Sequence, residues 1–476
     1  SLVGSEMCIR DRDFIVAIEL GSSKMTGIAG RKNPDGSISI LAVAKEDSAS
    51  YIRKGVAYNI ERTAQGLSNI VSKLKNTLKT EIEQVYVGIG GQSIHSVKNS
   101  IVKELPLDCI VSQDMVNELM DTNRSMEYKD CEILDAITQE YNVDGHYEDD
   151  PVGIQARHLE GNFLNVLWRR SFYRNLNKSL DNSGIKVAEM YLAPLTMADC
   201  VLTDAEKRAG CVLVDLGADT TTVSVYYRNK LRHIAVLPLG GSNVTKDLES
   251  LQIDEINAEA MKLKHASALT NEKDIDADAT LPIGDGRTIP SRMFIQVVEA
   301  RMLEIVENVK YLVPHEFADK LLGGIVLTGG GSNMKNVEKL FHEVFDVEKV
   351  RIAKSTTLNI NKKDSDVILS EDGTTNTILG LLAKGDMNCA GRAISGSLFD
   401  EEVEPGSENT VTLDPTLATT GTGTQPAAQT TAQPAANAEE EEEEKAPEPH
   451  KPTKFSRFFG SLKKFGSSIF EPDVNE

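Results

Sequence analysis

The chain carries the same arrangement of apolar and small residues twice, and this repeat limits the folds that it can adopt. Residues 13–30 form an apolar run, a turn of small residues and a second apolar run. Residues 210–237 follow the same plan, with Asp215 at the place of Glu19. Short β-rich runs joined by Gly-containing turns are typical of hairpins. The repeat therefore predicts two hairpins of one design in two parts of the chain.

Helix-like sequence follows each predicted hairpin, at residues 61–79 after the first and at residues 243–265 after the second. Strands followed by helices indicate α/β units. We therefore expect an α/β fold of two related lobes, each of which opens with a hairpin. The chain has 476 residues, of which 40% are hydrophobic, so it is long enough to build several cores.

The turns of both predicted hairpins place a carboxylate two residues before a glycine and hydroxyl groups after it. One such turn is most simply an ordinary hairpin, but two matching copies indicate a shared role. Backbone N–H groups around such a turn bind anions, and a lysine supplies a point charge to a phosphate. The candidate phosphate-binding residues are Gly21, Ser22, Ser23, Lys24, Gly217, Ala218, Asp219, Thr220 and Thr221.

The two repeated carboxylates, Glu19 and Asp215, are the candidate catalytic residues and Mg²⁺ ligands. Magnesium prefers oxygen ligands and keeps several of its waters, so the carboxylates would hold it through those waters. Two facing hairpins around a cleft suit a nucleoside triphosphate with its Mg²⁺.

A third glycine-rich turn lies in residues 323–341, where an apolar strand leads through three glycines into a predicted helix. Glycine lets the backbone approach a ligand closely, and the N-terminus of a helix favours an anion or a base edge. Further candidates are therefore Gly329, Gly330, Gly331 and Ser332. The same pattern also fits any strand-to-helix turn of an α/β fold.

Composition excludes several other classes of protein. The net charge of −21 argues against nucleic-acid binding, which needs a basic surface. The six cysteines are scattered without a C-x-x-C pair, which indicates a reducing cytoplasm and no disulfide framework. The chain has no Gly-Lys dipeptide and therefore no P-loop, and Ser93 replaces the last glycine of a dinucleotide motif that begins at Gly88. Residues 1–12 show no periodic pattern, and we expect a non-native or disordered leader there.

Residues 400–453 differ sharply from the rest of the chain. They contain thirteen acidic and two basic residues, no aromatic residue, and six consecutive glutamates, Glu439 to Glu444. Such a segment cannot bury enough apolar surface to offset the entropy lost on ordering. We expect a disordered linker there, after a folded body of residues 13–399.

Residues 454–470 contain four bases and no acid, and their apolar residues recur at helical spacing. This pattern predicts an amphipathic helix that binds an anionic bilayer in the plane of its interface. The same helix could instead dock on the folded body or in a groove of a partner. Residues 471–476 are expected to be disordered. The candidate membrane-binding residues are Phe455, Arg457, Phe458, Phe459, Leu462, Lys463, Lys464, Phe465, Ile469 and Phe470.

Through the two hairpins and the three-glycine turn, the chain resembles the actin-like ATPase superfamily, which includes actin, Hsp70-type chaperones and sugar kinases. Within it, residues 13–390 are most similar to the FtsA family of bacterial division proteins. VYVGIGGQSIHSVKNS, ITQEYNVDG and DPVGIQARHLEGNF look like the inserted subdomain of that family. PLGGSNVTKDL and AEAMKLKHASAL look like its second-lobe helices on the nucleotide side.

The resemblance implies two actin-like lobes around a nucleotide cleft, with an FtsA-type inserted subdomain, a disordered linker and a C-terminal amphipathic helix. The first lobe would comprise residues 13–95 and 175–209, the insert 96–174, the second lobe 210–350, and residues 351–399 would return to the first lobe. ATP and Mg²⁺ are the implied cofactors. The resemblance places four more residues near the nucleotide: Gly240, Gly241, Glu259 and Lys262.

The resemblance also implies a function: an ATP-binding division protein that anchors the FtsZ ring to the cytoplasmic membrane and recruits later division proteins. Its partners would be FtsZ, through about residues 245–320, anionic lipids, other division proteins, and copies of itself in protofilaments. It would be peripheral, at the cytoplasmic face of the septum. Glu19 replaces the aspartate usual in the superfamily, so at most slow ATP hydrolysis is expected. A sugar kinase, a chaperone, and a pilus-assembly or cell-shape actin homologue remain alternatives.

Overall fold

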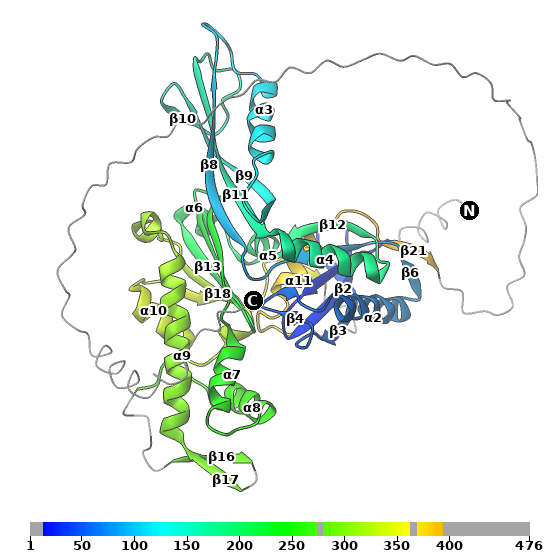
Figure 1. The fold of residues 1–476 in the computed structure, drawn as a ribbon, viewed down its shortest axis with the longest axis vertical. Helices are drawn as coiled ribbons and strands as arrows, with labels where there is room; N and C mark the ends of the chain where they lie inside the picture. The colour runs from blue at the N-terminus through cyan, green and yellow to red at the C-terminus, as the bar shows by residue number, and fades with distance from the viewer. Residues whose placement is uncertain are drawn as a thin grey trace, which may run out of the picture. The chain divides into compact units, whose positions relative to one another are not determined.

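The computed structural model divides the chain into two units, Ser1–Phe399 and Asp400–Glu476. It describes residues 13–393 except 272, 274–275, 277–278, 285 and 362–368 (Figure 1). All described residues belong to the first unit. The expected leader, linker and membrane-binding segment lie outside the described residues.

The first lobe is built on a six-stranded sheet with the strand order β12-β7-β1-β2-β3-β20. The first repeat forms β1 and β2, which pair antiparallel, while β1 pairs parallel with β7. The strands are β1 (Ile15–Leu20), β2 (Lys24–Lys32), β3 (Ile38–Asp47), β7 (Val85–Ile89), β12 (Val187–Leu192) and β20 (Ile360–Asn361).

Helices cover both faces of this sheet. Because alternate residues of a strand point to opposite sides, two glycines of β2 can face helices on the two sides. A Cβ atom on Gly27 of β2 would lie 2.3 Å from Ile70 in α2, whereas one on Gly30 would lie 2.7 Å from Leu382 in α11. The glycines thus let both helices approach the sheet. The helices of this lobe are α2 (Ile60–Leu78), α4 (Arg170–Ser183), α5 (Ala193–Val201) and α11 (Asn376–Lys384).

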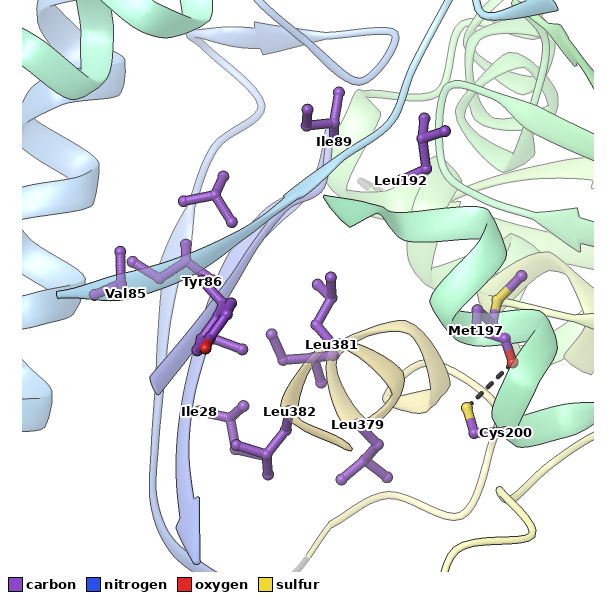
Figure 2. Packing of buried hydrophobic residues seen from close by; sticks show 14 of the residues in the cluster. Ile28, Val85, Tyr86, Ile89, Leu192, Met197, Cys200, Leu379, Leu381 and Leu382 are labelled. Atoms are coloured by element: carbon purple, nitrogen blue, oxygen red, sulfur yellow. Dashed lines mark hydrogen bonds between the residues drawn. The ribbon is translucent and has the colours of Figure 1, made fainter. Parts of the chain in front are cut away.

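Figure 2 shows the core between α11, α5 and the sheet. Leu381 and Leu382 of α11 are buried with Ile28 and Tyr86 of the sheet, and a Cβ atom on Gly88 would lie 2.5 Å from Leu381. Since α11 follows the second lobe in sequence, the chain returns to the first lobe after that lobe. Strand β20 likewise pairs with β3, and β21 (Ala390–Ala393) pairs with β6 (Thr80–Ile82).

The second repeat forms the antiparallel strands β13 and β14 of the second lobe. Their sheet continues through β15 on one side and through β18 and β19 on the other. The strands are β13 (Cys211–Leu216), β14 (Thr221–Tyr227), β15 (Lys230–Leu237), β18 (Gly324–Thr328) and β19 (Val350–Ile352), with a separate hairpin of β16 (Thr280–Gly284) and β17 (Arg287–Pro290). The helices are α6 (Asp204–Ala209), α7 (Gly241–Glu249), α8 (Glu255–His265), α9 (Ser291–Leu312) and α10 (Val337–Phe345). The helical stretch expected over 243–265 is thus two helices.

The inserted region forms four strands and one helix: β8 (His95–Glu104), α3 (Gln113–Arg124), β9 (Cys131–Val143), β10 (His146–Glu148) and β11 (His158–Arg169). In sequence it interrupts the first lobe, between β7 and β12. In space β8 pairs with β15 at His95 and Ala235, so the insert extends the second-lobe sheet to nine strands (Figure 1). Its last strand leads directly into α4, which packs on α2 of the first lobe. This helix ends at Ser183, beyond residue 174, where the insert was expected to end.

Candidate functional site

The two repeated hairpins have short, tightly closed tips. In the first lobe, Leu20 pairs with Met25, which leaves residues 21–24 as the turn. In the second lobe, Leu216 pairs with Thr221, and the N–H of Gly217 donates to the carbonyl of Thr220 at 2.9 Å. The predicted hairpins are therefore confirmed, and both carboxylates lie on the first strand just before the tip.

The two tips lie beside each other, and a third turn shows this directly. Strands β4 (Ile52–Arg53) and β5 (Val56–Ala57) are joined by a two-residue turn. The N–H of Gly55 in this turn donates to Oγ of Ser22 at 2.8 Å, and the N–H of Lys54 donates to Oδ2 of Asp219 at 3.1 Å. Adjacent amides thus contact both hairpins, so the candidate residues of the two lobes share one site.

Glu19 and Asp215 form a carboxylate pair at the base of this site. Burial, together with the negative charge of Asp215, raises the pKa of Glu19 to about 7. Burial alone raises the pKa of Asp215 to about 6. Lys24 and a hydrogen bond from Thr377 partly offset the effect at Glu19. Two desolvated, mutually repelling carboxylates favour a bound cation, because a cation compensates both charges.

The donor types also fit magnesium. Within the described ranges, no group of three or more His, Cys, Asp or Glu side chains could hold a metal ion. Mg²⁺ is usually bound by one or two carboxylates, with waters and substrate phosphates as the other ligands. Glu19 and Asp215 match that requirement.

The three-glycine turn packs against Asp215. Gly329 has φ of 81°, and a Cβ atom there would lie 2.3 Å from Oδ1 of Asp215. A Cβ atom on Gly331 would lie 3.0 Å from Leu216. The expectation of a helix opening directly at the glycines is wrong: residues Gly330–Asn333 form a 3-10 turn, and α10 begins only at Val337.

The N-terminus of α7 closes over the second hairpin. The N–H groups of Gly241 and Ser242 donate to the carbonyls of Gly217 at 3.0 Å and Ala218 at 2.7 Å. A Cβ atom on Gly240 would lie 2.4 Å from the carbonyl oxygen of Ala218. These amides therefore hold the hairpin tip, and Gly240 and Gly241 support the site through the protein backbone.

Glu259 and Lys262, which the resemblance placed near the nucleotide, form an ion pair on α8. Their Oε2 and Nζ atoms are 2.6 Å apart. The ammonium of Lys262 also donates to the carbonyl of Gly241 at 3.0 Å and to Oγ1 of Thr245 at 2.9 Å. The pair therefore fixes α8 to the start of α7, behind the hairpin tip.

Several candidate hydroxyl groups bond to the protein itself. Oγ of Ser332 donates to the carbonyl of Gly329 at 2.7 Å, and Oγ1 of Thr221 donates to that of Leu239 at 2.9 Å. Both side chains are fully buried. Ser23 is exposed and Thr220 is half-buried, so these hydroxyls are the more accessible ones.

A turn next to the site, at residues 372–374, was not predicted from the sequence. Hydrogen bonds from Thr374 outweigh the effect of burial and lower the pKa of Asp372, with a smaller contribution from the positive charge of Lys24. Asn333 Nδ2 donates to the carbonyl of Asp372 at 2.7 Å. The neighbouring Gly373 has φ of 79°, and a Cβ atom there would lie 3.2 Å from Thr328. The Asp-Gly dipeptide was the available signal for this turn.

Comparison with known proteins agrees with this geometry. Residues 212–370 match the family model described as "Cell division protein FtsA", and residues 91–167 match one described as "SHS2 domain inserted in FTSA". A cell division protein FtsA of Porphyromonas gingivalis is 32% identical over 362 residues, with 74% of this chain and 75% of the relative covered. That of Neisseria meningitidis is 29% identical over 342 residues, with 70% and 82% covered.

A solved structure gives the same fold at lower identity. The structure titled "PilM-PilN type IV pilus biogenesis complex" has a TM-score of 0.53 and 14% sequence identity, and the match covers 78% of this chain and 98% of that one. This similarity supports the two-lobed fold described above.

Proposed function

Because the chain belongs to the FtsA family of actin-like cell division proteins, we propose that it binds ATP with Mg²⁺ between its two hairpins and anchors the FtsZ ring to the membrane. Anchoring FtsZ is the known role of this family. The observation that carries the nucleotide proposal is the convergence of Glu19, Asp215 and Gly329 beside the paired hairpin tips.

ATP would lie with its phosphates between the tips, near the turns of residues 21–24, which include Lys24, and of residues 217–220. Glu19 and Asp215 would hold the metal, which would neutralise phosphate charge. The Glu259–Lys262 pair and the three-glycine turn flank this region, so the base and sugar would extend toward them. Hydrolysis would be slow, because the side chain of Glu19 is longer than that of the aspartate usual in the superfamily. The added length would shift the position of the metal or of the attacking water.

Membrane attachment would be peripheral and would depend on residues 454–470. Within the described residues, no helix is both long enough and apolar enough to cross a bilayer. The four bases and the Phe-rich face of the C-terminal segment suit an anionic lipid surface. The acidic residues 400–453 would keep the linker away from that surface, so the body could reach FtsZ, its own copies and other division proteins.

Nucleotide binding is tested by titrating a fluorescent ATP analogue into the full chain with Mg²⁺ and with EDTA. Asp215→Asn should weaken Mg²⁺-dependent binding at least tenfold, which is about 1.4 kcal/mol. The control Asp121→Asn changes an exposed residue of α3 in the insert and should leave affinity unchanged. Absence of binding by the unmodified chain, or equal binding with EDTA, would contradict the proposal.

FtsZ recruitment is tested separately by flotation of FtsZ with vesicles of anionic lipid in the presence of this chain. FtsZ should float only when both the vesicles and the chain are present. If FtsZ remains at the bottom while the chain itself floats, the adaptor role is wrong although lipid binding holds.

A further inference from the structure

The two lobes are joined near the site by two kinds of hydrogen bond. On the α11 side, the buried Nδ2 of Asn376 donates to Oγ1 of Thr328 at 3.0 Å and to the carbonyl of Ala353 at 2.7 Å. At the hairpin tips, the bond from the N–H of Lys54 to Asp219 is exposed. Water can compete for the exposed bond far more easily than for the buried ones. The buried bonds thus resemble a hinge, and the exposed bond can open.

The donor of the exposed bond is rigidly fixed to the first lobe. Lys54 has φ of 50° and Gly55 has φ of 73°, the two left-handed positions of a tight hairpin turn. The N–H of Gln92 donates to the carbonyl of Lys54 at 2.8 Å, and a Cβ atom on Gly55 would lie 2.5 Å from Cα of Gly91. Contacts within the first lobe therefore hold the amide of Lys54 in place.

The acceptor belongs to the other lobe and to the proposed phosphate-binding tip. Asp219 precedes Thr220, whose carbonyl closes the turn with Gly217. Since Ser22 and the Lys54–Gly55 turn are on the same lobe, their bond can persist when the lobes separate. Of these two adjacent bonds, only the one to Asp219 has to break for the tips to move apart.

We propose that Asp219 and the Lys54 amide form a latch between the lobes, and that nucleotide enters and leaves the cleft when this bond is broken. Asp219 is here a positioning residue that acts through the neighbouring turn. The kinetic part rests on the proposed binding of ATP between the hairpins. The latch itself does not, because its donor and its acceptor are both groups of the protein.

The variants Asp219→Ala and Asp219→Asn distinguish loss of the hydrogen-bond acceptor from the effect of any substitution at residue 219. Alanine removes the acceptor, whereas asparagine keeps an oxygen that can accept from the Lys54 N–H. The control Glu343→Ala removes an exposed carboxylate of α10. Thermal unfolding of all variants verifies that each one is folded.

The first measurement is residue-resolved hydrogen exchange of the Lys54 amide in the nucleotide-free full chain. Asp219→Ala should speed exchange about fivefold or more, while Asp219→Asn and Glu343→Ala remain within about twofold of the unmodified chain. Unchanged exchange in Asp219→Ala, or equal acceleration in Asp219→Asn, would overturn the latch.

The second measurement is the dissociation rate of a fluorescent ATP analogue by stopped flow. Asp219→Ala should release it about fivefold faster, and Asp219→Asn should stay closer to the unmodified chain. Equal release rates in all variants would overturn the control of nucleotide exchange. If the unmodified chain binds no nucleotide, the proposed function fails, and the exchange of the Lys54 amide still decides whether the latch exists.

Discussion

Asp215 and Gly329 are so close that a Cβ atom on Gly329 would lie 2.3 Å from Oδ1 of Asp215. One residue is the repeated carboxylate of the second hairpin, and the other is the first glycine of the three-glycine turn. The absence of a side chain at Gly329 therefore determines where the carboxylate of Asp215 can be.

Gly329→Ala should displace the Asp215 carboxylate and weaken Mg²⁺-dependent nucleotide binding at least tenfold. It should also lower the free energy of unfolding by about 1–3 kcal/mol, because alanine is strained at this φ. Gly36→Ala is a matched control: its φ is 80°, but nothing lies within 4 Å of its added Cβ. Titration and urea unfolding should show a comparable backbone cost for both variants and a binding defect only for Gly329→Ala. A binding defect of the same size in Gly36→Ala would contradict this explanation.

The stability of the nucleotide-free protein should fall as pH rises from about 4.5 to 7. In this range the unfolded state ionises Glu19, whose ordinary pKa is 4.5, while the folded state keeps it protonated because its pKa is about 7. The native state thus holds more protons, so the free energy of unfolding decreases with pH, by at most ~3 kcal/mol for this group. Urea unfolding across this range checks the slope. Glu19→Gln should reduce it and leave the part due to Asp215, whose pKa is also raised by burial.

Binding of Mg²⁺ with ATP should therefore release protons near pH 6.5, since the pKa values of Glu19 and Asp215 are about 7 and 6. Calorimetry in two buffers of different ionisation enthalpy measures the number released. Release should disappear in the Glu19→Gln, Asp215→Asn double variant. Proton uptake on binding would show that the metal does not meet these carboxylates.

Arg301→Lys should loosen the support of the second hairpin. Nε and Nη2 of Arg301 on α9 bond to Oδ2 of Asp247 at 2.5 Å and to Oδ1 at 2.9 Å, which ties α9 to α7. Lysine cannot form this fork, so we expect a loss of about 1–2 kcal/mol in unfolding free energy and weaker nucleotide binding. The control Arg170→Lys changes a single, more exposed pair with Glu132, with an expected loss below about 0.5 kcal/mol. Similar losses in both would argue against the fork.

Phe458→Glu with Phe459→Glu should abolish flotation of the full chain with anionic vesicles, because both charges fall on the predicted apolar face of residues 454–470. The control Val411→Glu with Leu413→Glu adds the same charge within residues 400–453 and should float normally. Equal flotation of the two double variants would refute attachment through the C-terminal segment.

Features encoded by local patterns could be predicted from the sequence. The repeat identified both hairpins, and the family resemblance pointed to Glu259 and Lys262, which form an ion pair on α8. The helix expected over 61–79 is α2, Ile60–Leu78. In each case the controlling residues are close together in the chain.

Features that depend on distant residues could not be predicted in this way. Nothing near His95 indicates that it pairs with Ala235, so an inserted subdomain was expected but not its pairing with the second-lobe sheet. The contacts of Lys54 with Asp219 and of Asp372 with Asn333 likewise join segments far apart in the sequence. The break between α7 and α8 includes Gln252 with φ of 61°, a left-handed conformation that no local pattern predicts.

The insert meets the second lobe along a short backbone seam that side chains reinforce. Between β8 and β15, His95 pairs with Ala235, the N–H of Val236 donates to the carbonyl of Ile94 at 3.1 Å, and Ser96 Oγ accepts from the N–H of Ile234 at 3.0 Å. The pairs Lys98 with Glu316 and Arg232 with Gln139 add contacts across the same boundary. On its other side, the insert runs without interruption into α4, which packs on the first lobe. Any rotation of one lobe against the other would therefore concentrate shear at this seam. A pair of fluorophores, one on β8 and one on β15, would therefore be the most sensitive probe of cleft opening.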